Sequence, residues 1–363
     1  MPRIFEVLKK ENLLDKTKNK KDKANNPKST QKDSTSFLHR MLTEDRRIEK
    51  KSEDYSLMSH KLIQEIKLHG VDNAQKAKEI YSEAAKAVDT LLQKIRLKED
   101  YSADIDKIFS LLDDIFNQLI LGDSILENIY NENNAEYYLP YHIVNVLVLS
   151  YALALSLGFN KSQINNLGKA VVFYDLGMDD FREIIQLDRR LNEEEYNLVK
   201  NHIANSIEIV DKIGALNKEI LAAIQMHHER VNGSGYPLGM RLDEINLPAK
   251  IIGLVDTYAA MVEARAYRQG MSAHQAIRSL LSSQKDEFDE EVLRVFINKM
   301  SVYPIGSIVR LDTQELARVI NVFPGSPLRP VIMIIQDANG EPAKETRIID
   351  LSKCDFPSIL DSI

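Results

Sequence analysis

The spacing of apolar residues predicts helices over most of the first 300 positions. Between about residues 37 and 135, apolar side chains recur every three or four residues, which is the period of one helix face. Two such series are Ile80, Ala84, Ala87, Val88, Leu91 and Ile95, and Ile105, Ile108, Leu111, Leu112, Ile115 and Leu119. Amphipathic helices of this kind pack on a neighbouring domain or pair between two copies of a chain. A homodimer through these N-terminal helices is therefore one expectation.

The helical pattern continues from 136 to 300. Residues 143–157 form the most apolar run, but it falls short of the ~18–20 uninterrupted apolar residues of a membrane span and predicts a buried core helix. We therefore expect no membrane span. Asn192, with Glu195 three positions later, matches a capping box, which should open the helix that carries His202.

After residue 300 the pattern changes from helical to strand-like. Short runs rich in β-branched residues at 307–311, 316–322 and 330–335 predict strands. Proline, glycine and asparagine at 324–327 and 339–340 supply turns between and after them. We therefore predict a mainly α fold, with a helical body followed by a small β appendage.

The composition is that of an ordinary soluble globular protein, with 44% hydrophobic and 28% charged residues among 363. A single cysteine, Cys354, excludes internal disulfides and fits a reducing compartment. The lysine-rich start has no apolar signal core. We expect a cytoplasmic protein.

The net charge of −7 is unevenly distributed. Residues 1–36 carry ten Lys or Arg against five Asp or Glu, a balance of +5, so the remainder carries −12. An acidic body argues against broad nucleic-acid binding. The basic arm has almost no aromatic residues, and its composition predicts a solvated, disordered tail.

The segment 227–237 carries the most specific chemistry in the chain. It places His227 and His228 at the end of an apolar helical run, and imidazoles are common ligands of zinc, iron and manganese. Gly233 and Gly235 follow, and we expect both to reach positive φ and to let the backbone approach a ligand closely.

This segment, ending in Gly-Tyr-Pro, resembles the signature of the HD-GYP family, a branch of the metal-dependent HD phosphohydrolases. The resemblance covers roughly residues 75–350. Further matches are His142 in Tyr141-His142, Asp175 in Phe173-Tyr174-Asp175-Leu176-Gly177, His202 in Lys200-Asn201-His202, Asp256 in Asp256-Thr257-Tyr258-Ala259-Ala260-Met261, and Arg265-Ala266-Tyr267-Arg268. Taken singly, each residue would suit an ordinary structural role. Together, four of the eight histidines fall at the family's positions in order.

The resemblance implies an all-helical HD-type phosphohydrolase domain. The expected division is a disordered basic arm at 1–36, an N-terminal helical region at 37–135, an HD-GYP-like domain at 136–300 and a β appendage at 301–363. It also implies one or two divalent transition metals, with iron or manganese favoured over zinc. The expected ligands are His142, Asp175, His202, His227, His228 and Asp256. Asp175 is shared between the two metal sites and is the expected catalytic carboxylate.

The family pattern is incomplete at one of these sites. The site of Asp175, His202, His227 and His228 has its full set, whereas the site of His142, Asp175 and Asp256 has Tyr174 in place of the histidine of the His-Asp doublet. A neutral phenol is a poor ligand because its pKa is near 10. Tyr138 stands where some members have a glutamate, Met178 where the family has a lysine, Asn232 where the loop has an aspartate and Ala259 where an acidic residue is common.

The residues that the family uses around the nucleotide are retained. They are Tyr236, Arg265, Arg268, Gly233 and Gly235. The expected partner is cyclic di-GMP or a related nucleotide. Three functions stay open: a signalling protein that binds metal and nucleotide with weak or no hydrolysis, an active cyclic di-GMP phosphodiesterase, and a structural interaction module.

Overall fold

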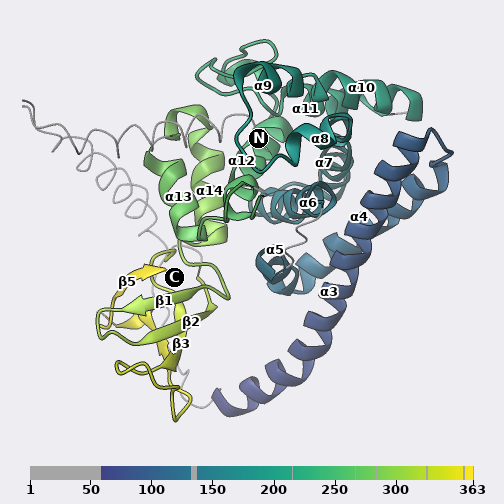
Figure 1. The fold of residues 1–363 in the computed structure, drawn as a ribbon. Helices are drawn as coiled ribbons and strands as arrows, with labels where there is room; N and C mark the ends of the chain where they lie inside the picture. The colour runs from purple at the N-terminus through teal and green to yellow at the C-terminus, as the bar shows by residue number, and fades with distance from the viewer. Residues whose placement is uncertain are drawn as a thin grey trace, which may run out of the picture.

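The computed structural model describes residues 59–131, 137–214, 216–265, 267–282, 284–323, 326–354 and 356–362. The predicted disordered arm at 1–36 lies outside these residues. Within them the fold is mainly helical, with a small antiparallel sheet at the C-terminal end, as predicted (Figure 1).

The N-terminal region forms two long helices, α3 (Ser59–Leu97) and α4 (Ser102–Leu121), which pack against each other and along one side of the body (Figure 1). All six apolar positions predicted for the α4 face are buried. On α3 the buried stripe also includes Tyr81, which the apolar pattern did not single out. Both helices share one hydrophobic core with the domain that follows.

Helix α6 (Leu139–Ser156) lies at the centre of the body, and 15 of its 18 residues are buried. Among the described residues it also has the length and hydropathy of a membrane span, but 83% of it is buried inside the protein, as expected of a core helix. Helices from the N-terminal region, the middle of the chain and the end of the helical body all pack on it. The remaining α-helices of the body are α5 (Asn128–Asn131), α7 (Lys161–Phe173), α8 (Arg182–Ile185), α9 (Glu193–Val199), α10 (His202–Ile213), α11 (Lys218–Met226), α12 (Leu247–Val262), α13 (Ala273–Ser282) and α14 (Glu290–Met300).

Short 3₁₀ turns join several of these helices. They are η2 (Asp123–Glu127), η3 (Leu176–Phe181), η4 (Leu242–Glu244) and η5 (Lys285–Glu287). The turn η3 packs on α10 and brings the chain after α7 across the start of that helix.

One predicted helix is in fact two. The capping box of Asn192 and Glu195 is present, but it opens α9, which ends at Val199. His202 begins a separate helix, α10. At the break, Asn201 N donates to the Leu198 carbonyl three positions back at 3.1 Å, and Nδ1 of His202 lies 2.7 Å from the carbonyl oxygen of Val199.

The C-terminal sheet has five antiparallel strands in the order β4-β3-β2-β1-β5. The predicted strands are β1 (Ile308–Leu311), β2 (Leu316–Asn321) and β3 (Val331–Gln336). The edge strands β4 (Ile348–Asp350) and β5 (Ile359–Ser362) were not predicted, and η6 (Leu351–Lys353) follows β4. Both edge strands are short and contain no buried residue, so they lack the alternation of buried apolar and exposed polar residues that reveals a strand.

Candidate metal and nucleotide site

Four of the predicted ligands form a buried, histidine-rich group. Asp175 precedes η3, His202 begins α10, and His227 and His228 follow the last turn of α11. One potential ligand atom from each lies within 4.8 Å of those of the other three. Their exposed fractions are only 0–2%. Segments 25 to 53 positions apart in sequence therefore bring imidazoles and a carboxylate to one point inside the protein.

The hydrogen bonds of two imidazoles leave their Nε2 atoms free to act as ligands. His202 Nδ1 lies 2.7 Å from the Val199 carbonyl oxygen, and His227 Nδ1 lies 2.7 Å from the Ile224 carbonyl oxygen. A carbonyl only accepts, so each Nδ1 carries the proton and each Nε2 presents a lone pair. These two Nε2 atoms are 3.4 Å apart. Asp175 Oδ1 lies 3.4 Å from the first and 3.8 Å from the second.

Burial keeps these imidazoles uncharged. It lowers the pKa of His202 to about 3 and that of His227 to about 4, and it lowers the pKa of His228 well below the usual range. Burial and the nearby carboxylate of Asp256 raise the pKa of Asp175. Nε2 of His228 and Oδ1 of Asp175 are buried, and neither has a hydrogen-bond partner within the described part of the chain. Such a set of lone pairs, facing one another without donors, fits a divalent cation.

The second group contains His142, Asp175 and Asp256, whose potential ligand atoms also lie within 4.8 Å of one another. Here two of the candidate ligands contact each other directly, since His142 Nε2 lies 2.8 Å from Asp256 Oδ1. Tyr174 fills the position of the family's histidine and donates its hydroxyl proton to the same Asp256 oxygen at 3.1 Å. Burial and the surrounding carboxylates raise the pKa of Tyr174 well above its usual value, so it stays a neutral phenol.

Glu263 is a neighbour of this group that sequence reasoning missed. Its Oε2 lies 2.8 Å from His142 Nδ1. Burial would lower the pKa of His142, but the carboxylates of Glu263 and Asp256 outweigh it and raise that pKa to about 9. The only sequence signal for Glu263 was an acidic residue at the end of the apolar α12, two positions before Arg265.

The loop after His228 is held by the charged pair Glu229 and Arg230, both buried. The Glu229 carboxylate accepts from three successive backbone N–H groups, those of Leu238, Gly239 and Met240, at 2.6, 3.1 and 2.8 Å. Arg230 donates to the His227 carbonyl and to the Thr257 hydroxyl, at 3.1 Å in both cases. The pair therefore shapes the loop and ties the end of α11 to α12.

The two loop glycines have different roles. Gly233 has φ +77°, as expected. Gly235 does not have a positive φ, so that part of the expectation was wrong. A Cβ on Gly235 would lie 2.4 Å from Arg230 N and from Glu229 Cα. Glycine is therefore needed at 235 because the loop passes close to its own backbone at residues 229 and 230. This approach carries Tyr236 back over the histidines, where its ring stacks on His228 with centroids 4.6 Å apart.

Arg265 and Arg268 are both tied into the protein. Arg265 packs over the ring of Tyr138, with 3.5 Å between its guanidinium carbon and the ring centroid, and donates to Glu263 Oε2 at 2.8 Å. Arg268 donates to the carbonyl oxygens of Ala260 and Met261 at 2.5 and 2.9 Å, so it caps the C-terminal end of α12. Each keeps one buried nitrogen without a hydrogen-bond partner within the described residues, Nη1 and Nε respectively.

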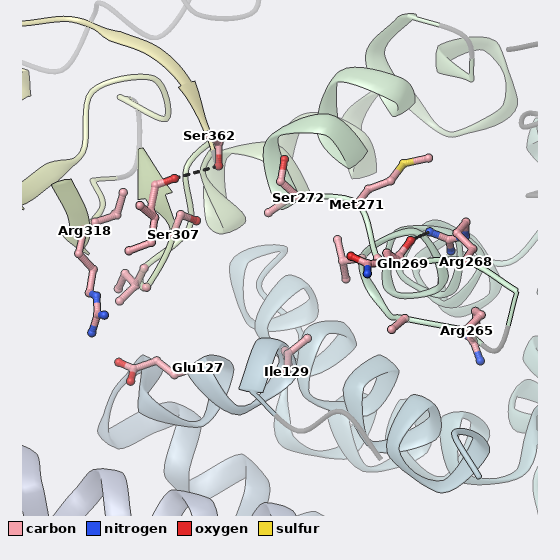
Figure 2. Close-up of a pocket in the computed structure, with 18 of the residues that line it drawn as sticks. Glu127, Ile129, Arg265, Arg268, Gln269, Met271, Ser272, Ser307, Arg318 and Ser362 are labelled. Atoms are coloured by element: carbon pink, nitrogen blue, oxygen red, sulfur yellow. Dashed lines mark hydrogen bonds between the residues drawn. The ribbon is translucent and has the colours of Figure 1, made fainter. Parts of the chain in front are cut away.

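Both arginines line a large cleft between the segment after α12 and the C-terminal sheet (Figure 2). The cleft has a volume of about 1140 Å³. Figure 2 shows Arg318 and Ser307 of the sheet side facing Glu127 and Ile129 across it. Such a volume is slightly above the range of about 300–1,000 Å³ that is typical of small-molecule sites.

The other departures from the family pattern lie in different surroundings. Met178 and Ala259 are fully buried in the hydrophobic core. Asn232 is exposed, and its side chain accepts from the backbone N–H of Ser234 at 3.0 Å. A lysine at 178 would therefore meet an apolar environment in this chain.

Comparison with known proteins gives two family matches and several similar proteins. Residues 125–292 match the family described as HD domain, and residues 308–362 match the KOW domain associated with HD domain. The chain is 26% identical over 273 residues to cyclic di-GMP phosphodiesterase PA4108 of Pseudomonas aeruginosa, covering 75% of this chain and 65% of that protein. It is 27% identical over 195 residues to cyclic di-GMP phosphodiesterase PdeB of Borreliella burgdorferi, covering 53% and 51%.

The chain thus spans about half to two thirds of the length of these relatives. A solved structure, Bd1817, an HDG"Y"P protein from Bdellovibrio bacteriovorus, matches with a TM-score of 0.53 and 16% identity. The match covers 72% of this chain and 77% of that one, and it supports the fold alone. Residues 125–292 are therefore an HD domain. Against the HD-GYP pattern that the sequence resembles, Tyr174 stands at the histidine position of the His-Asp doublet.

Proposed function

We propose that this chain is a cyclic di-GMP signalling protein that binds a divalent transition metal and the nucleotide, with weak or no hydrolysis. One observation carries the proposal: a complete group of three neutral imidazoles and one carboxylate lies beside a group in which Tyr174 replaces an imidazole. The complete group would hold one cation tightly. The other would hold a second cation weakly, because Tyr174 offers a proton to Asp256 instead of a lone pair to a metal.

The ligand roles follow from this geometry. Asp175, His202, His227 and His228 would hold the tight cation, and His142, Asp175 and Asp256 the weak one. Iron or manganese remains our preference over zinc, on the family resemblance. Cations at such a site neutralise phosphate charge and polarise the phosphate group. Asp175 belongs to both groups and is the carboxylate we assign to catalysis in any residual hydrolysis.

The nucleotide would be held from the loop and from the segment after α12. Tyr236 lies over His228, Gly233 and Gly235 shape the loop beneath it, and Arg265 and Arg268 line the cleft. Two guanidinium groups provide positive charge where a phosphate would bind. The curated relatives are named cyclic di-GMP phosphodiesterases, which supports cyclic di-GMP or a related nucleotide as the ligand.

An active phosphodiesterase is the second candidate. It is favoured by the names of the same relatives and by the convergence of all six candidate ligands on two adjoining groups. It would require the weak group to fill at cellular metal concentrations despite Tyr174.

Three broader assignments remain proposals. We propose that the helical region extends to 135, the HD-GYP-like domain spans 136–300 and the β appendage spans 301–363, and that the protein is cytoplasmic. A homodimer through the N-terminal helices is supported by three exposed apolar side chains where α3 ends and where α4 ends, namely Leu97, Ile120 and Leu121.

Metal content and turnover of the protein purified without air test the proposal. We expect close to one metal per chain, measurable binding of cyclic di-GMP and little hydrolysis. Tyr174→His should raise the metal content towards two and increase hydrolysis by at least tenfold, because an imidazole binds a divalent metal near neutral pH without losing a proton. Tyr174→Phe is the matched control, since it removes the hydroxyl and supplies no ligand.

Two results would count against the proposal. Wild-type turnover equal to that of Tyr174→His would favour the active enzyme. An absence of nucleotide binding in all three proteins would favour a structural interaction module.

A further inference from the structure

A chain of buried hydrogen bonds joins the N-terminal helix α3 to the incomplete metal group. Tyr81 Oη donates to Asn145 Oδ1 at 2.6 Å, and Asn145 Nδ2 donates to Glu263 Oε1 at 2.8 Å. The other oxygen of Glu263 lies 2.8 Å from His142 Nδ1, and His142 Nε2 lies 2.8 Å from Asp256 Oδ1. The links are 64, 118, 121 and 114 positions apart in sequence, so tertiary packing alone creates them.

The residues that form this series of hydrogen bonds are shielded from solvent. Tyr81, Asn145, His142 and Asp256 are at most 1% exposed, and the Glu263 side chain is 11% exposed. Hydrogen bonds in such surroundings hold orientation well, because breaking one leaves a buried polar atom without a partner. Three helices contribute to this hydrogen-bond chain. Tyr81 comes from α3, His142 and Asn145 from α6, Asp256 from α12, and Glu263 from the residue that follows α12.

Each link determines the orientation of the next. The carboxylate of Glu263 only accepts, so Nδ1 of His142 carries a proton and Nε2 is the atom turned towards Asp256. Arg265 Nη2 donates to the same Glu263 oxygen at 2.8 Å and lies 3.3 Å from His142 Nδ1. Asn145 must present its amide nitrogen to Glu263, since its amide oxygen accepts the proton of Tyr81.

We propose that Glu263 is a positioning residue for His142, and that Tyr81 of α3 acts on it through Asn145. The inference rests on the assignment of His142 and Asp256 as metal ligands in the proposed function. On this view α3 is part of the support of the metal site and not merely an attached helix. Carboxylates that accept from the second nitrogen of a ligand histidine commonly change metal affinity by about 10–100-fold when removed.

The test measures metal affinity in the Tyr174→His protein, where the weak group has its full ligand number. The probe is Co²⁺ added to the metal-free protein, followed by titration calorimetry and by the visible absorption of bound cobalt. Glu263→Gln should weaken the second cobalt ion by about 10–100-fold, by loss of the charged acceptor. Tyr81→Phe should weaken it by a few fold. Neither change should alter the first, histidine-rich ion.

Tyr151→Phe is the matched control. Tyr151 is likewise fully buried on a body helix, but its hydroxyl has no hydrogen-bond partner within the described residues. It should leave both cobalt ions unchanged. Thermal unfolding of each variant shows that the fold is kept, and Tyr81→Phe provides the test if Glu263→Gln does not fold.

A double variant separates positioning from general destabilisation. If Tyr81 acts through Glu263, Tyr81→Phe should have almost no effect on the second ion once Glu263→Gln is present. If Tyr81→Phe lowers the affinity for the second ion equally in the presence and absence of Glu263→Gln, the proposed route is overturned. A Tyr81→Phe protein that behaves like Tyr151→Phe would also overturn it.

The outcome also distinguishes this inference from the proposed function. A protein that binds cobalt tightly at the histidine-rich group but is insensitive to Glu263 and Tyr81 disproves only the positioning role. A protein that takes up no cobalt at either group disproves the metal assignment and the positioning role with it.

Discussion

At the residue scale, Glu229 joins the metal-site histidines to the loop that follows them. It comes directly after His228, is only 5% exposed, and accepts three backbone N–H groups through its two oxygens. The sequence showed only a charged pair after two histidines. The structure shows a buried carboxylate that organises the loop carrying Tyr236.

Glu229→Gln should destabilise the protein by about 2–4 kcal/mol, because the amide nitrogen cannot accept and would face a backbone donor. Chemical denaturation measures this change. The control is Glu244→Gln, which alters an exposed glutamate that accepts one backbone N–H, from Arg241 at 2.7 Å. Its cost should stay below about 1 kcal/mol. Equal costs for the two variants would show that the loop does not depend on Glu229.

At the scale of elements, the packing of η3 on α10 brings Asp175, which precedes η3, next to His202, which begins α10. Gly177 N donates to Ser206 Oγ at 2.9 Å, and Ser206 Oγ donates to the Tyr174 carbonyl at 3.0 Å. A Cβ on Gly177 would lie 2.3 Å from the His202 carbonyl oxygen and 2.7 Å from Ser206 N. Only glycine allows this approach, which places Asp175 beside His202.

Gly177→Ala should therefore weaken metal binding as well as folding. We expect a loss of about 1–3 kcal/mol in the free energy of unfolding. We also expect a fall on the order of tenfold in the affinity of the tight metal. Gly168→Ala on α7 is the control, because its Cβ would meet the Tyr151 hydroxyl and not the metal group. It should destabilise the protein without changing metal affinity. Unchanged metal binding in Gly177→Ala would contradict the role given to this contact.

At the scale of the whole molecule, the buried ionisable groups link folding to pH. The folded pKa values of His202, His227 and His228 lie below the ordinary value of 6.5, so the unfolded chain binds more protons than the folded chain below that pH. Their contribution to stability is present above pH 6.5 and is lost as the pH falls. His142 has a folded pKa of about 9, so its contribution is present below pH 6.5 and is lost as the pH rises through 9.

The metal-free protein should therefore be most stable near pH 6.5–7. Asp175, whose pKa is raised, opposes the three histidines on the acid side, which leaves about two net protons and a slope on the order of 2–3 kcal/mol per pH unit. Denaturant unfolding between pH 5 and 9 measures this. His202→Gln should reduce the acid-side slope by about one proton. A stability that does not change from pH 5 to 7 would show that the histidines are not held neutral.

Much of the architecture is determined by local sequence patterns. Helical periodicity predicts the buried faces of α3, α4 and α6, because burial on one side of a helix requires apolar residues at that period. The change to β-branched runs predicts the three central strands for the same kind of reason. The spacing of the family motif brought six candidate ligands to attention, and they do converge on two adjoining groups.

Other features depend on the tertiary structure. The break before His202, where its ring lies 2.7 Å from the Val199 carbonyl oxygen, appears only in the structure. The proposed positioning roles of Glu263 and Tyr81 depend on contacts with residues more than 60 positions away in the sequence. For Tyr174, the resemblance of the sequence to the family identifies the missing imidazole, but only the packing shows that the phenol hydroxyl donates to Asp256. A sequence pattern records which face of an element is buried, whereas the partner of a buried polar atom is chosen by how distant elements pack.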